Sequence, residues 1–522
     1  MRRAALILST LAFALFMAGC GSQSSNSSNP IVTNPETVPV SMTVTDTPPA
    51  NVTVLFFQLN ITSALLSPGN VSLLPSTNPI PVNVTQLQTE SAFLGSQNVT
   101  AGTYSSLVLT FANPELTIFN GSGATIGTGA NACANNTVCQ LTPTATNLTL
   151  TFNTAPFPVT VAANTPLAFK LDIHLDTVIQ SDLSVNLAAT NGVTISPLPA
   201  PSSGTTVTAL GSLTGAIQSV NSTTSPNSFT LQTGDGRTFT IDVNSSTTYS
   251  NFPSSACSTE TLACLATQQI VKVEVSLQTG GTLLASSVAY VQPASQLVVE
   301  GNIIRLSTSS GNTVMDMILQ KGPPQPATGT ALPAFGNRAT VTVPTTGVNY
   351  KVDSGSFTIP SGLTFTGATN LMVGQLVSVV VAPGTVTAPT GSGSPISITA
   401  PAATTFTASD ITLEPSQITG GVAAINTGNL TFNLATNANY FVPPAPNATA
   451  APIPAPVTIT VDTTSATTFL PLTLSPDTLF GLKLNDVVSV KGWIFSTPTG
   501  ATTITMAADT VLDRGSITAA LF

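Results

Sequence analysis

The chain has 522 residues, of which 12 are basic and 21 are acidic, so only 6% carry a formal charge, against roughly 25% in typical soluble proteins. The few basic residues and the net charge of -9 exclude a nucleic-acid binder that relies on phosphate contacts. Hydrophobic residues make up 42% of the chain, which supplies apolar surface for folded cores and excludes a charge-rich disordered protein.

Residues 1–19 have the features of an export signal. Arg2 and Arg3 precede an apolar run, residues 4–18, that is too short to span a bilayer comfortably. Residues 17–20, Met-Ala-Gly-Cys, resemble the lipobox of bacterial lipoproteins. The resemblance implies cleavage before Cys20 and acylation of its sulfur and its new amino group. The alternative is an ordinary secretory signal with a chance cysteine.

The lipobox implies a membrane partner and a location. Several acyl chains, each contributing about 0.8 kcal/mol per buried methylene, would anchor the protein in a bilayer. Gly21 stands where an Asp commonly marks retention in the inner membrane of Gram-negative cells, so we expect the outer membrane of a bacterial envelope. Residues 20–39 are rich in Ser, Asn and Pro, which predicts a flexible tether.

The block at residues 40–197 shows apolar residues alternating with Thr or Ser, as in Val38, Val40, Met42 and Val44. A period of two with β-branched residues predicts half-buried strands. The Asp-x-Pro element at Asp46 and the Ala-Gly-x-Tyr element ending at Tyr104 resemble bacterial lipoproteins of domain of unknown function 4382. The resemblance implies an exported β-sandwich and no particular chemistry.

Four cysteines remain after Cys20, and they form two close pairs in the sequence, Cys133 with Cys139 and Cys257 with Cys264. Polar neighbours place both pairs in loops, and an exported protein meets an oxidising environment. We therefore predict two local disulfides. Zinc binding is the weaker alternative, because no further Cys or His pair lies at ligand spacing.

Three signatures recur in the same order three times after residue 208, which predicts three repeats. The first has a central glycine: Gly215, Gly301 and Gly420. The second ends in an alternating Val strand, and the third carries a buried-type Ala, as in Ala285, Ala408 and Ala508.

A strand glycine permits a bend or a close backbone approach, so each repeat is expected to form a small barrel of about five strands, of which the OB-fold is one form. The repeats resemble the exported domain of unknown function 5666. The expected boundaries are residues 208–292, 297–415 and 416–513, which completes an all-β architecture of one sandwich and three barrels.

One concentration of ionisable residues stands out. In an extended strand, Asp172, His174 and Asp176 would line one face. Two carboxylates beside an imidazole would suit a divalent metal or polarise a proton carrier, whereas a solvated strand face would give the same pattern without any site. Asp46 is a further candidate ligand, although an Asp before Thr-Pro-Pro is also expected to hydrogen-bond the backbone of its turn.

These features predict a lipid-anchored envelope protein that is not an enzyme, needs no cofactor, and has a structural role or binds a polysaccharide or another envelope protein. The alternative is a metal-dependent hydrolase built on Asp172, His174 and Asp176, with Asp46 or Glu115 converging on them. A third option, single-strand nucleic-acid binding by the barrels, is disfavoured by the acidic charge balance and the lack of basic, aromatic-lined strands.

Overall fold

A computed structural model describes residues 36–516 apart from residues 48–52, 76–77, 121, 136, 199–209, 254–256, 258, 279, 294, 323–333, 356, 383–384, 386–395, 398–403, 437–456, 471–477 and 497–503. The expected signal peptide, Cys20 and the tether up to residue 35 lie outside the described residues. The first strand begins at Thr37.

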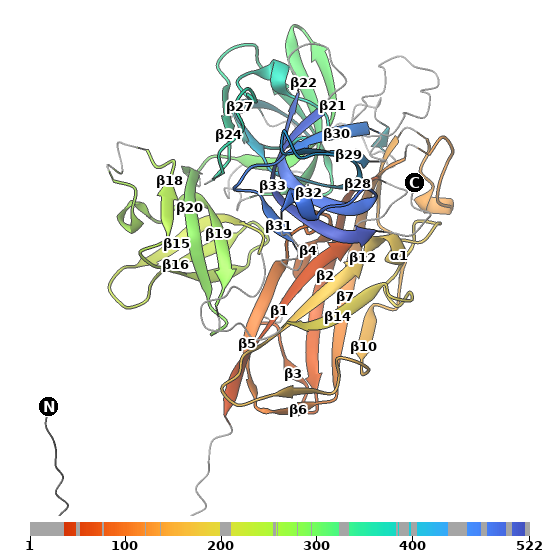
Figure 1. The fold of residues 1–522 in the computed structure, drawn as a ribbon, viewed down its shortest axis with the longest axis vertical. Coiled ribbons are helices and arrows are strands. Elements are labelled where there is room, and N and C mark those ends of the chain that lie inside the picture. Colours follow the sequence, from red (N-terminus) through yellow and green to blue (C-terminus); the bar gives the residue numbers. More distant parts are fainter. Residues whose placement is uncertain are drawn as a thin grey trace, which may run out of the picture.

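The N-terminal domain is a sandwich of two β-sheets (Figure 1). The first sheet has the order β14 (Val193–Leu198), β12 (Leu167–His174), β1 (Thr37–Thr47) and β5 (Ala92–Thr100). The second has the order β26 (Ile396–Ser397), β8 (Thr137–Leu141), β7 (Ser106–Asn120), β2 (Thr53–Ser67) and β3 (Val71–Ser72), with β10 (Thr149–Phe152) on β7 and β4 (Ile80–Asn83) on β2.

Shorter elements accompany the sheets of the sandwich and the strands of the later domains. β6 (Gly102–Tyr104) pairs with β11 (Val159–Val161), and β9 (Ala145–Thr146) pairs with β13 (Val185–Asn186). The single four-residue helix α1 of the described chain spans Leu175–Val178. Single 3₁₀ turns lie at Val84–Gln86, Gly129–Asn131, Leu262–Cys264, Ala368–Asn370 and Leu479–Gly481.

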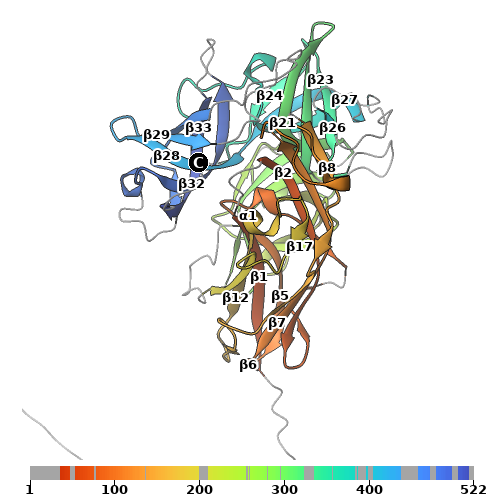
Figure 2. The same ribbon diagram turned by 90° about the vertical axis from the view of Figure 1, so that its right-hand side faces the viewer.

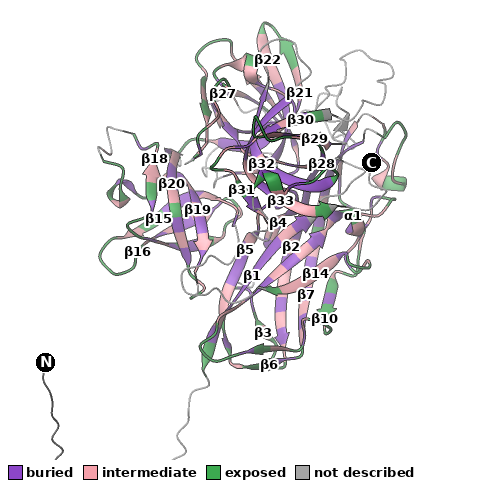
Figure 3. Cartoon of the chain, in the orientation of Figure 1, coloured by how far each residue is buried: buried purple, intermediate pink, exposed green. Residues whose placement is uncertain are grey.

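The alternation read from the sequence matches the observed core of the sandwich. The buried face of β1 carries Val38, Val40, Met42 and Val44, each at most 1% exposed. These side chains share one hydrophobic cluster with Phe57 of the facing sheet and Leu109 of β7. Figure 3 shows the same alternation of buried and less buried residues along the strands. The prediction of an N-terminal β-sandwich is confirmed.

Each repeat forms a closed five-stranded barrel with one additional short strand. The first strand pairs with the second and fourth, and the third pairs in parallel with the fifth, giving the closed order 1-2-3-5-4-1 in all three barrels. This Greek-key order is of the kind seen in OB-folds. The predicted all-β class and barrel-like repeats are therefore confirmed.

The strands of the barrels occur in the same succession along the chain. Barrel 1 contains β15 (Leu213–Asn221), β16 (Asn227–Thr233), β17 (Thr238–Val243), β18 (Thr248–Ser250), β19 (Gln269–Leu277) and β20 (Leu283–Pro293). Barrel 2 contains β21 (Val298–Ser309), β22 (Asn312–Lys321), β23 (Arg338–Val343), β24 (Asn349–Val352), β25 (Leu376–Val381) and β27 (Thr404–Glu414). Barrel 3 contains β28 (Ser416–Asn426), β29 (Thr431–Thr436), β30 (Val457–Asp462), β31 (Thr468–Leu470), β32 (Asp486–Ser496) and β33 (Ile504–Ser516).

The signature glycine has the same physical role in each barrel. A Cβ atom on Gly215, Gly301 or Gly420 would lie 2.3 Å from a backbone carbonyl oxygen of the second strand. The first strand also shows a register irregularity just after each of these glycines. The glycine therefore permits a close backbone approach where the first strand bends around the barrel.

The barrels pack on the sandwich and on each other, so the domains are not separate units joined only by linkers. Figures 1 and 2 show barrels 2 and 3 at one end of the sandwich, and Figure 1 shows barrel 1 beside them. Phe56 and Phe119 of the sandwich share a hydrophobic cluster with Ile318 of barrel 2. Trp493 and Phe495 of barrel 3 belong to the core cluster of barrel 2. Within the described residues, no helix has the length and apolar character that crossing a membrane requires.

Replacing Gly215 with Ala is expected to destabilise barrel 1 by about 1–3 kcal/mol, the usual range for overpacking. Urea unfolding of residues 20–522, with Cys20 replaced by Ser, measures the effect. Gly280→Ala in the same barrel is the matched control, since a Cβ at Gly280 meets nothing within 4 Å. Equal stabilities of the two variants would contradict the close-approach role.

Candidate functional site

The structure brings two of the three predicted metal ligands together. Asp172 and His174 lie on the same face of β12, with His174 Nε2 3.9 Å from Asp172 Oδ2. His174 Nε2 also lies 3.4 Å from Thr194 Oγ1 on the neighbouring strand β14. The prediction that Asp176 continues this strand face was wrong, because the strand ends at His174 and Asp176 lies in the first turn of α1.

The helix forms because it buries two apolar side chains that a strand would separate. Leu175 and Val178 are both fully buried. In a strand, residues three apart point to opposite faces, whereas in a helix they lie on the same face. The backbone N–H of Ile179 donates to Leu175 O at 3.2 Å and closes the turn.

Asp46 lies at the end of β1, beside Ile173 of β12, and its carboxyl group is buried with no hydrogen bond to either oxygen from the described residues. The turn that it was expected to hydrogen-bond, residues 48–52, lies outside the described residues. Burial raises the pKa of Asp46 well above its usual value; Arg514 of barrel 3 opposes this, and Asp172 and Asp176 add to it. The Arg514 guanidinium donates to Asp46 O at 2.9 Å and to Gln88 O at 2.6 Å. The end of β1 is thus a contact between the sandwich and barrel 3.

These groups do not assemble a metal site among the residues that the structure describes. No group of three His, Cys, Asp or Glu side chains is close enough there to hold a metal ion. Asp46 does come within electrostatic range of Asp172 and Asp176, whereas Glu115 lies on β7 in the second sheet and its pKa is raised by burial. Metal binding by Asp172, His174 and Asp176 stays a prediction that nothing in the geometry strengthens.

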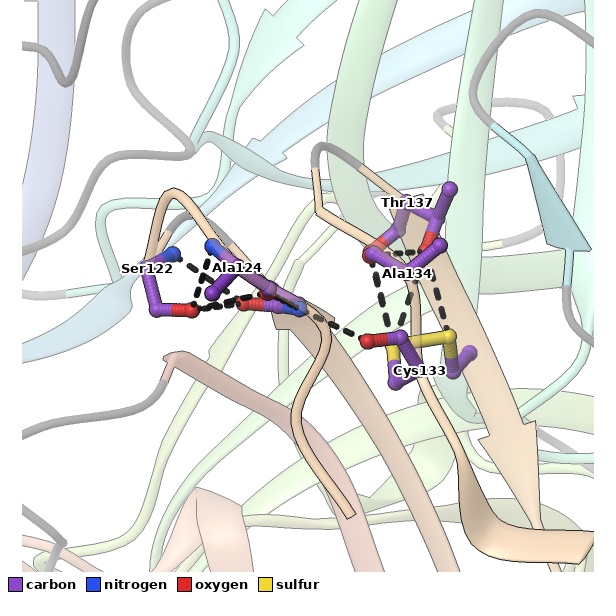
Figure 4. The surroundings of a disulfide bond; sticks show 7 residues. Ser122, Ala124, Cys133, Ala134 and Thr137 are labelled. Carbon is purple, nitrogen blue, oxygen red and sulfur yellow. Dashed lines mark hydrogen bonds between the residues drawn. A yellow bond between two sulfur atoms is a disulfide. The ribbon is translucent and has the colours of Figure 1, made fainter. Parts of the chain in front are cut away.

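Both predicted disulfides are present, Cys133 with Cys139 and Cys257 with Cys264. Figure 4 shows the first at the start of β8, beside the segment that carries Ser122 and Ala124. The Asn120 side-chain amide donates to Ala124 O and to Cys133 O, both at 2.8 Å. The disulfide and this amide together fix the loop against the end of β7.

The strongest concentration of charge lies where the four domains meet, in a network of buried and half-buried side chains that we call the four-domain junction. It comprises Glu90 of the sandwich, Lys272 and Glu274 of barrel 1, Glu300, Asp353 and Glu414 of barrel 2, and Lys491 and Asp509 of barrel 3. Eight of the 33 charged side chains of the protein are therefore gathered here. Since unpaired buried charges are strongly disfavoured, their partners determine how the domains can pack.

Lys272 of β19 is the centre of the junction. Its ammonium group lies 2.6 Å from Asp353 Oδ2 and 2.7 Å from Glu414 Oε2, so one lysine of barrel 1 binds two carboxylates of barrel 2. The three side chains are at most 15% exposed. Burial alone would lower the pKa of Lys272, but Glu414 and Asp353, with Glu274 and Glu300, hold it well above its usual value. Lys272 is therefore a permanent cation within this interface.

Barrel 3 joins the junction through two residues of β32. Lys491 forms an ion pair with Glu90 of the sandwich, and both side chains are at most 13% exposed. Trp493 Nε1 donates to Asp353 O at 3.0 Å, and its ring lies 5.0 Å from the Phe357 ring. Burial would lower the pKa of Lys491, but Glu90, Glu274 and Asp509 raise it above its usual value. The junction thus connects all four domains through side chains separated by up to 401 positions in the sequence.

The junction was not predicted from the sequence. Lys272 stands between Val271 and Val273, and alternation places it on the outward face of the strand, where a lysine normally meets water. The one available signal was composition, because a protein with so few charges gains little by placing a lysine on a strand face without a partner. Nothing in a strand pattern shows which distant carboxylates supply that partner.

Replacing Lys272 with Met is expected to destabilise the protein by about 3–5 kcal/mol, because it leaves the Asp353 carboxylate buried without its cation and removes the hydrogen bond to Glu414. The matched control is Lys351→Met, since Lys351 lies 3.9 Å from Asp410 with 63% of its side chain exposed and an exposed pair contributes about 0–1 kcal/mol. Urea unfolding measures both. Similar losses of unfolding free energy in the two variants would show that the ion pairs of Lys272 contribute no more than an exposed surface pair.

Comparison with known families agrees with the fold. Residues 37–197 match the family model described as Domain of unknown function (DUF4382). Residues 214–289 match the one described as Domain of unknown function (DUF5666). None of the curated proteins matches the chain. Both resemblances noted in the sequence are therefore confirmed over these residues: the sandwich is similar to the DUF4382 family, and barrel 1 is similar to the DUF5666 family.

Proposed function

We propose that this protein is a lipid-anchored component of a bacterial envelope, in which the sandwich carries three barrels away from the outer membrane for a non-catalytic binding or structural role. The partner would be a polysaccharide or another envelope protein. The lipobox resemblance at Cys20 supports the anchor, and the course of β1 through the sandwich supports the arrangement.

The observation that carries the proposal is that β1 begins and ends at opposite ends of the sandwich. Its first residue, Thr37, pairs with Thr100, and Ala101 N donates to Glu36 O at 2.8 Å, next to β6. Figures 1 and 2 both show β6 at the end remote from barrels 2 and 3. The last part of β1 contacts Arg514 of barrel 3 through Asp46 O.

Eleven residues of strand separate these two ends by roughly 33 Å. The chain therefore enters the sandwich at the end opposite barrels 2 and 3. If Cys20 is acylated, this geometry supports an arrangement in which the sandwich is nearer the membrane than these barrels. Such an arrangement suits a protein that presents its far end to a partner.

The anchor is tested by expressing the full chain in a Gram-negative host with labelled palmitate. We expect the wild type to incorporate the label and to sediment with outer membranes, because acyl chains on Cys20 bind the bilayer. The Cys20→Ala variant is expected to lose the label, and Ser22→Ala serves as a matched control that keeps it. An unlabelled wild-type protein would contradict the proposed anchor.

The binding role is tested with residues 20–522 carrying Cys20→Ser on a glycan array and in a pull-down with peptidoglycan and with outer-membrane proteins. Saturable binding to one of these classes is expected. The heat-unfolded protein is the control for adsorption through exposed apolar segments. Saturable binding to none of them would contradict a binding role and leave a structural one.

A further inference from the structure

We propose that Lys272 of barrel 1, with Asp353 and Glu414 of barrel 2, forms a proton-dependent latch within the four-domain junction. We call these three residues the Lys272 cluster. The latch holds barrel 1 against barrel 2 when the cluster is protonated and releases barrel 1 when it is not. This inference goes beyond the proposed function and depends neither on the anchor nor on the identity of a partner. It rests on the contrast between the interfaces of barrel 1 and those of the other barrels.

Barrels 2 and 3 are joined by apolar packing, whereas barrel 1 is joined to them by charge. Trp493, Phe495 and Ala507 of barrel 3 lie in the core cluster of barrel 2. The buried cluster of barrel 1, among the described residues, includes one side chain from another domain, Phe93 of the sandwich. Lys272 of barrel 1 donates hydrogen bonds to Asp353 and Glu414 of barrel 2. Domain interfaces without a large apolar area permit relative motion.

A second, separate attachment supplies a pivot. Gly211 N donates to Ser91 O at 3.1 Å, and the Arg237 guanidinium donates to Phe93 O at 2.9 Å. The rings of Phe93 and Phe239 lie 6.4 Å apart. These contacts hold barrel 1 to the start of β5 of the sandwich. If the Lys272 contacts open, barrel 1 stays attached at Ser91 and Phe93 and through the short segment between Pro293 of β20 and Val298 of β21, and can move relative to barrel 2 within these limits.

The charge balance of the cluster requires a proton. Lys272 faces Glu414, Asp353, Glu274 and Glu300, and the other cations nearby are already engaged. Lys491 faces Asp353 but is paired with Glu90 and also faces Glu274 and Asp509. Lys321 lies at the margin, 3.5 Å from Glu300. The carboxylates therefore outnumber the cations, and full ionisation would leave the closed interface with a buried excess of negative charge.

Glu414 is the group that holds this proton. Its burial raises its pKa to about 8; Lys272 opposes the rise, and Asp353 and Glu300 add to it. Opening rehydrates Glu414 and returns its pKa toward the ordinary 4.5. The closed state then binds more protons than the open state, so closure is strongest below about pH 4.5 and weakens as the pH rises through about 8.

Asp353 acts in the opposite direction at lower pH. Burial raises the pKa of Asp353, but Lys272, a hydrogen bond with Glu414 and the charge of Lys491 together outweigh burial and hold it below its usual value. A depressed pKa contributes stability that is present above the ordinary value of 3.8 and is lost as the pH falls through the depressed value. The latch is therefore expected to be tightest near pH 4, between the ordinary pKa values of 3.8 for Asp353 and 4.5 for Glu414, and to weaken at strongly acid pH as well as toward pH 8.

Distance measurements between spin labels test the latch. Cysteines replace the exposed Ser245 of barrel 1 and the exposed Thr308 of barrel 2 in residues 20–522, where Cys20→Ser leaves no other unpaired thiol. We expect one narrow distance distribution at pH 5.5 and an added, broader population at pH 9. The closed-to-open ratio should fall by up to about tenfold per pH unit between pH 5.5 and about pH 8 and level off above it, since one proton is linked to closure.

Glu414→Gln and Asp410→Asn separate the latch from a general effect of pH. The neutral amide of Glu414→Gln imitates the protonated acid, so this variant is expected to keep the narrow distribution at pH 9. Asp410→Asn, at the exposed pair with Lys351, is expected to behave like the wild type. An unchanged wild-type distribution between pH 5.5 and pH 9 would overturn the proposal. A Glu414→Gln variant whose distance distribution broadens at pH 9 as the wild type's does would also overturn the proposal. If this variant does not fold, the comparison of the wild type at pH 5.5 and pH 9 still decides.

Discussion

The arrangement of the four domains depends on the pairing of two buried lysines with carboxylates from other domains. Lys272 joins barrel 1 to Asp353 and Glu414 of barrel 2, and Lys491 joins barrel 3 to Glu90 of the sandwich. A buried charge without its partner is strongly destabilising, whereas a paired one adds little net stability compared with apolar packing. The junction therefore acts mainly by excluding other ways of packing the domains, while apolar clusters supply the cohesion.

This division of roles explains a composition with only 6% charged residues. Thr, Ser and Asn cover the outward faces of the strands, so charged residues are not needed there for solvation. Several of the few that occur lie between domains, such as Arg237 against Phe93 O and Arg514 against Asp46 O. The scarcity of charge makes these interfaces more specific, because few other places on the molecule offer a matching partner.

The fold could be predicted because periodicity and repeated glycines are local signals. The alternation around Met42 gave the buried face of β1, and the close approach at Gly301 explains why each repeat keeps a glycine. The strand prediction failed at Asp176, where burying both Leu175 and Val178 favours a helical turn. The junction could not be predicted, since the partners of Lys272 lie 81 and 142 residues away and meet only after the barrels have packed.

The most direct test is small-angle X-ray scattering of residues 20–522 carrying Lys272→Met, Asp353→Asn and Glu414→Gln together, compared with the wild type at pH 5.5. Neutralising all three side chains leaves no uncompensated buried charge, so the unfolding free energy should stay near that of the wild type. We predict that the radius of gyration rises, because the polar constraint on barrel 1 is gone. A folded triple variant with the wild-type scattering profile would contradict the claim that this junction sets the arrangement of the domains.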